Sequence, residues 1–127
     1  MGEARRGSRP LSPHLTVYRP QLAMVTSILT RITGISLLAG ALLAVAWFLA
    51  AASSPAYFET IDRLMTSFLG DLVMTASLWA LWFHTLAGVR HLIWDNLRGL
   101  DLPAAQILGW SVVVGSVMLT ILTLLIV

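Results

Sequence analysis

The stretch HTLAGVRHLIWD, residues 84–95, carries the side chains with the most capacity for chemistry. Its two histidines, His84 and His91, stand at the end of a strongly apolar run. An ionisable side chain is costly in a bilayer, so one found there marks a candidate functional site. On a helix the two histidines share one face but lie roughly 10.5 Å apart along the axis. They cannot both ligate one compact ion, so the spacing argues against a zinc site.

A large flat cofactor suits this spacing better. A haem can take His84 as an axial ligand while its propionates reach toward His91, Arg90 or Arg31 near the membrane surface. Gly88 stands one turn from His84 on the same face, where the missing side chain leaves room for the macrocycle. The stretch is therefore typical of a haem site inside a membrane.

These residues also have a plainer interpretation. His84 is consistent with a simple hydrogen bond to a neighbouring helix, and His91 with an interfacial position. Arg90 and Asp95 fit ordinary snorkelling and helix-end residues. A six-coordinate haem also needs a second axial ligand, and the remaining histidine, His14, lies in a polar N-terminal arm. A haem site therefore requires a second ligand from another chain.

A second polar cluster, SILTR at residues 27–31, opens the first apolar segment. Ser27, Thr30, Arg31 and Gly34 share one helical face. A hydroxyl and a guanidinium at the membrane edge can hydrogen-bond the carbonyl of an amphipathic ligand, and such a site would suit a quinone. The alternative is a helix start with an arginine anchor on the cytoplasmic side.

The elements that hold these side chains are those of an all-α membrane protein. The 127 residues are 57% hydrophobic and only 11% charged, and there is no cysteine. Disulfides and thiolate metal sites are excluded, so any redox chemistry needs a bound cofactor. The net charge is only +2 and no basic patch is interleaved with aromatic residues, so nucleic acid is not an expected partner.

The apolar runs predict three transmembrane helices in up-down-up order, since about 20 residues cross the hydrocarbon core. We expect a cytoplasmic arm over residues 1–26 and a transmembrane domain over residues 27–127, with spans at about 27–52, 64–91 and 104–127. Arginines gather in the arm and around the loop before the third span, which places the N-terminus in the cytoplasm.

Two stretches together resemble the cytochrome b membrane-anchor subunits of succinate dehydrogenase: RPLSPHLTVYRPQLAMVTSILTRITG, residues 9–34, and HTLAGVRHLIWD. The resemblance implies a four-subunit succinate:ubiquinone oxidoreductase, respiratory complex II, in a bacterial inner membrane. In it a flavoprotein with FAD oxidises succinate and an iron–sulfur subunit relays the electrons. Two small anchor subunits then hold haem b between them and help to reduce ubiquinone. This chain would hold no flavin and no dicarboxylate site.

The resemblance also implies residue roles. His84 matches the axial haem ligand, while Ser27 and Arg31 match quinone-pocket positions. Arg31 and His91 match positions near the haem propionates, and Asp95 matches a contact with the soluble subunits. No catalytic residue for succinate oxidation is expected here.

One position departs from the pattern that the resemblance implies. Many members carry histidine immediately before the arginine that corresponds to Arg31, where this chain has Thr30. Threonine can still donate a hydrogen bond. A fumarate reductase-type anchor and a haem-free structural anchor remain as alternatives. A small transporter fits less well, because Asp71 and His84 lie about 220° apart around their helix.

Overall fold

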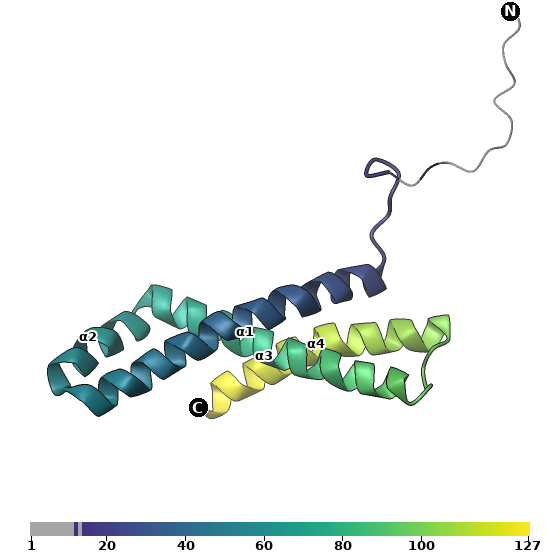
Figure 1. Cartoon of the computed structure of the whole chain (residues 1–127). Coiled ribbons are helices and arrows are strands. Elements are labelled where there is room, and N and C mark those ends of the chain that lie inside the picture. Colours follow the sequence, from purple (N-terminus) through teal and green to yellow (C-terminus); the bar gives the residue numbers. More distant parts are fainter. Residues whose placement is uncertain (1–11, 13) are drawn as a thin grey trace, which may run out of the picture.

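The computed structural model describes residue 12 and residues 14–127. Residues 1–11 and 13 lie outside the described residues, and they include Arg5, Arg6, Arg9 and much of the predicted arm. Within the described residues the regular structure is four α-helices and no strand (Figure 1). The helices are α1 (Leu22–Ser53), α2 (Pro55–Met65), α3 (Phe68–Asp95) and α4 (Leu102–Ile126).

Three of these helices, α1, α3 and α4, are long and apolar enough to cross a membrane. They contain 32, 28 and 25 residues, against about 20 needed for a span. Successive spans run in opposite directions, so the start of α1, the end of α3 and the start of α4 lie at one end of the molecule (Figure 1). The predicted all-α membrane fold with three spans is confirmed, and α3 contacts both α1 and α4.

The helix boundaries differ from the predicted spans in a way that matters for the site. Helix α1 begins five residues earlier, at Leu22, so the SILTR cluster lies beyond the first turn of the helix and not at its start. Helix α3 begins at Phe68 and continues through Asp95. One unbroken helix therefore carries His84, His91 and Asp95.

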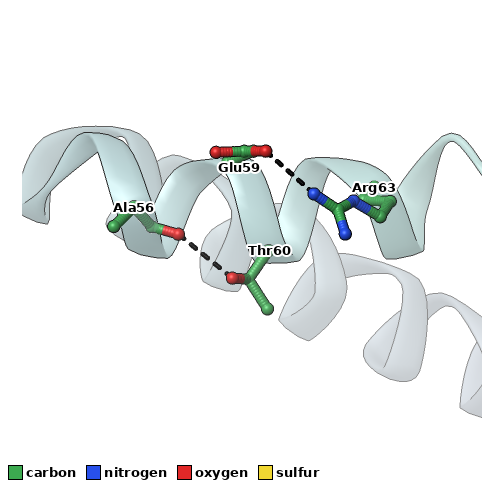
Figure 2. Close-up of polar contacts among 4 residues, drawn as sticks. All are labelled: Ala56, Glu59, Thr60 and Arg63. Carbon is green, nitrogen blue, oxygen red and sulfur yellow. Dashed lines mark hydrogen bonds and ion pairs between the residues drawn. The ribbon is translucent and has the colours of Figure 1, made fainter.

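The short helix α2 was not predicted, and it replaces part of the expected first connection. The hydroxyl of Ser54 caps it by accepting from the backbone N–H of Tyr57 at 3.3 Å, and a proline in the first turn favours the helical start. Figure 2 shows its polar side, where Arg63 pairs with Glu59 at 2.8 Å and Thr60 donates to the carbonyl of Ala56 at 3.0 Å. Both charged side chains are exposed, so this side suits the membrane–water boundary.

The corner between α2 and α3 depends on a glycine. A Cβ at Gly70 would collide with the backbone carbonyl oxygens of Leu64 and Met65, so any larger residue would force the corner to open. The hydroxyl of Ser67 caps α3 by accepting from the N–H of Gly70 at 3.2 Å. The close approach of α2 to α3 therefore has a local cause in the sequence.

The opposite corner joins α3 to α4. Leu97 and Gly99 both adopt positive φ, at 56° and 67°. The indole N–H of Trp94 donates to the carbonyl of Gly99 at 3.1 Å, and the carboxylate of Asp101 caps α4 by accepting from the N–H of Ala104 at 3.2 Å. These contacts hold the end of α3 beside the start of α4.

The buried core of the described chain is small. Phe83 and Ala87 of α3 pack against Val112 of α4, and partly buried apolar side chains surround them. Many large apolar residues face outward instead, such as Ile35 at 75% and Phe48 at 76% exposure on α1. Lipid or another apolar helix must cover such surface in a folded membrane protein.

Candidate functional site

The side chain of His84 points from α3 toward α1. Its Nδ1 lies 3.1 Å from the backbone carbonyl oxygen of Thr30. A carbonyl oxygen accepts hydrogen bonds and cannot donate them, so this contact requires the proton on Nδ1. The lone pair then resides on Nε2, which has no hydrogen-bond partner among the described residues. A ring nitrogen bonded to a backbone carbonyl, with the other left free, is the usual arrangement of a metal-ligating histidine.

The space beside His84 matches a large group better than a bare ion. No three histidine, cysteine, aspartate or glutamate side chains converge within the described part of the chain, so a compact metal site has no ligand set there. Gly88 lies one turn further on, and a Cβ built at this glycine would meet no atom within 4 Å. The free Nε2 of His84 and the open surface at Gly88 together fit a haem.

Ser27 and Arg31 lie one turn apart on α1, and both side chains are exposed. Nearby hydroxyls are occupied: Thr30 donates to the carbonyl of Thr26 at 2.7 Å, and Ser36 donates to that of Ile32 at 2.9 Å. By contrast, neither the Ser27 hydroxyl nor the Arg31 guanidinium has a hydrogen-bond or ion-pair partner among residues 12 and 14–127. Their donors remain available to a bound polar group.

Arg90 has a different position from the one expected. Its side chain is only 3% exposed, and its Nη1 donates to the hydroxyl of Thr26 at 2.8 Å. The guanidinium carbon lies 4.7 Å from the ring centroid of Trp94, a cation–π geometry. The snorkelling interpretation of Arg90 is therefore wrong: the charge points inward, between α3 and α1.

The hydrogen bond between Arg90 and Thr26 was not predicted from the sequence. It joins α3 to Thr26, the residue immediately before Ser27, and so holds the start of α1 against the end of α3. One signal was present in the sequence, because Trp94 stands four residues after Arg90, the spacing at which helical side chains meet. The partner on α1 had no such signal, since it depends on how the two helices pack.

His91 and Asp95 lie at the same end of the molecule, where α3 approaches its last turn. The Nδ1 of His91 lies 2.7 Å from the carbonyl oxygen of Ala87, and the imidazole meets Trp94 edge-on at 5.4 Å between ring centroids. Both His91 and Asp95 are exposed, and Asp95 forms no ion pair within the described chain. The position of His91 near the haem propionates and the contact of Asp95 with the soluble subunits therefore remain predictions.

The distinct apolar cavity at the other end of the molecule offers no such chemistry. It holds about 160 Å³ where α1, α2 and α3 meet, and side chains such as Leu43, Met65 and Met74 line it. Its walls are almost entirely apolar. The polar groups gather instead around Thr26, Thr30 and the last three turns of α3.

The sequence is similar to those of known proteins. The family model for the succinate dehydrogenase/fumarate reductase transmembrane subunit matches residues 5–123. The chain is 48% identical over 126 residues to the succinate dehydrogenase cytochrome b556 subunit of Paracoccus denitrificans, which covers 99% of this chain and 97% of that one. It is 37% identical over 114 residues to the corresponding subunit of Rickettsia conorii, with coverage of 90% and 89%. It is also 46% identical over 101 residues to the mitochondrial cytochrome b560 subunit of Sus scrofa, with coverage of 76% and 58%.

Proposed function

The chain belongs to the family of succinate dehydrogenase/fumarate reductase transmembrane subunits, and we propose that it is the cytochrome b anchor of a succinate:ubiquinone oxidoreductase. Partner subunits carrying FAD and iron–sulfur clusters oxidise succinate and deliver electrons. This chain, with a second small anchor subunit, binds haem b and forms part of the site where ubiquinone is reduced. The complex lies in a bacterial inner membrane, with the N-terminus of this chain in the cytoplasm.

The observation that carries the proposal is the hydrogen bond between His84 and Thr30. It favours the ring proton on Nδ1, and the lone pair this leaves on Nε2 supports that atom as the ligand of haem iron. The second anchor subunit supplies the other axial ligand, because His91 stands roughly 10.5 Å further along the same helix and His14 precedes α1. When bound, haem accepts and returns single electrons at a potential set by its axial ligands and burial.

The quinone part of the proposal rests on the unused donors of Ser27 and Arg31. Their hydroxyl and guanidinium bind and orient a quinone carbonyl, and the cationic guanidinium stabilises negative charge on that oxygen as the ring is reduced. Because Arg90 holds Thr26 from the α3 side, the turn that bears Ser27 has a fixed position against α3.

Three further residue roles complete the proposal. Arg31 and His91 lie toward the end of the spans that we assign to the cytoplasm, and they would hold the haem propionates, which are anionic. Asp95 ends α3 at the same face and contacts the soluble subunits. The exposed apolar side of α1 packs against the second anchor subunit and lipid.

The haem assignment is tested by reduced-minus-oxidised optical spectra of the purified complex. We expect a b-type band in the native complex that is lost or shifted in His84→Ala. His14→Ala is the matched control, because His14 is exposed outside the helices and, among the described residues, its ring bonds only the carbonyl of Ser12. A band unchanged in His84→Ala contradicts this ligand, and the lack of a band in the native complex leaves a haem-free anchor.

The quinone site is tested by Ser27→Ala, with Ser36→Ala as the matched control on the same helix. We expect Ser27→Ala to lower succinate-dependent ubiquinone reduction while reduction of a soluble dye by the partner subunits continues. Ser36 already bonds its own helix, so its variant should behave as the native complex does. Equal ubiquinone rates in Ser27→Ala and the native complex would remove Ser27 from the site. Comparing succinate oxidation with fumarate reduction separates the fumarate reductase-type alternative.

A further inference from the structure

Helix α1 approaches the imidazole of His84 at three residues, Thr30, Thr33 and Gly34. Nδ1 lies 3.1 Å from the Thr30 carbonyl oxygen and 3.4 Å from the Thr33 hydroxyl oxygen. A Cβ built on Gly34 would stand 3.1 Å from Cε1 of the ring, closer than most real Cβ contacts. The absence of a side chain at residue 34 therefore lets the ring lie closer to α1 than a methyl group would allow without a small displacement.

The hydroxyl of Thr33 has two carbonyl acceptors on its own helix. Its single proton is shared between the carbonyls of Leu29 at 2.8 Å and Thr30 at 3.1 Å. Thr33 is 1% exposed, so water cannot readily replace these partners. With its proton directed to either carbonyl, the Thr33 oxygen acts toward Nδ1 as an acceptor, which agrees with the proton on Nδ1.

We propose that Thr33 and Gly34 are positioning residues that set the orientation and electron-donating strength of the His84 imidazole as a haem ligand. This inference rests on the proposed function, in which Nε2 of His84 ligates the iron. An acceptor at Nδ1–H makes the imidazole a stronger donor at the other nitrogen. Gly34 fixes how closely the ring approaches α1, and hence the direction of its Nε2 lone pair.

The test compares Thr33→Val, Thr33→Ser and Gly34→Ala in the purified complex. Two quantities are measured: the midpoint potential of the haem by redox titration, and the electron paramagnetic resonance spectrum of the ferric haem. Valine removes the Thr33 oxygen as a second acceptor, with little change in shape, and keeps the Thr30 carbonyl. Thr33→Val should therefore raise the potential, because the ligand stabilises ferric iron less. Thr33→Ser keeps the oxygen and should restore the native potential.

Gly34→Ala should displace the ring by a few tenths of an ångström and alter the resonance spectrum. Gly40→Ala is its matched control, since Gly40 also lies on α1 and its Cβ would stand 3.0 Å from the hydroxyl of Ser77 on α3. Both variants crowd the same helix pair, but only Gly34→Ala crowds His84. A shift in Gly40→Ala as large as that in Gly34→Ala would attribute the effect to helix packing and overturn the inference.

Native potentials and spectra in both Thr33→Val and Gly34→Ala would also overturn it. If Gly34→Ala fails to assemble, the comparison of Thr33→Val with Thr33→Ser decides. The His84→Ala variant distinguishes a failure of the ligand assignment from a failure of the positioning roles. A haem band lost in that variant, with Thr33 and Gly34 variants unchanged, rejects the positioning roles alone. A band retained in His84→Ala rejects the ligand and the positioning roles together.

Discussion

Replacing Thr26 with valine removes the hydrogen-bond acceptor that the buried guanidinium of Arg90 uses in the described chain. The bond measures 2.8 Å and Arg90 is 3% exposed, while its Nε has no partner there. Hydrogen bonds to charged groups contribute about 1.5–3 kcal/mol, whereas interhelical bonds in membranes average about 0.6 kcal/mol. Because a charge is left buried here, we expect a loss near 2 kcal/mol, or about 30-fold in the unfolding equilibrium.

The assay is SDS titration of the purified subunit in mixed micelles, with helix content followed by far-ultraviolet circular dichroism. Thr26→Ser keeps the hydroxyl and serves as the control. The Arg90→Met background supplies the decisive comparison, because methionine retains an unbranched stem and needs no acceptor. There, Thr26→Val should cost no more than about 0.5 kcal/mol. An equal loss of stability from Thr26→Val in the Arg90 and Met backgrounds would refute the hydrogen bond as its cause.

Three further substitutions have expected outcomes. Gly70→Ala places a methyl group against the carbonyl of Met65, so we expect a large fall in assembled complex, measured by subunit content of the membranes. The Cβ of Gly88→Ala would meet no atom of the described residues within 4 Å, so assembly should stay intact, but the haem-to-protein ratio should fall because the methyl group fills space beside the proposed ligand. Trp82→Phe removes the 3.0 Å bond to the Thr123 hydroxyl, and should cost about 0.6–1.7 kcal/mol in the SDS titration.

The three spans were predictable because lipid imposes a strong requirement on the sequence. Each span needs about 20 apolar residues and satisfies its backbone within the helix, so composition and length are sufficient signals. Helix α2 carries no comparable signal, since its eleven residues mix exposed charges with apolar positions. Its recognisable start is local, from Ser54 and Pro55, but whether such a start extends to a helix depends on packing against α1 and α3.

The part of the candidate site that lies on a single helix was predictable. The spacing of His84 and Gly88 follows from helical geometry, and the structure keeps both on α3. Contacts between helices were not predictable in this way. That Arg90 meets Thr26 while His84 meets Thr30 depends on the register of α3 against α1, which no periodicity within either segment specifies.

Thr30 shows why that register matters for the position where the resemblance implies histidine in many members. Threonine can still donate a hydrogen bond there, and in the structure its hydroxyl donates to the carbonyl of Thr26 at 2.7 Å. The contact of residue 30 with His84 comes from its backbone carbonyl, which every residue type possesses. Substitution at position 30 can therefore change the polar side chain there while the tautomer of His84 is preserved.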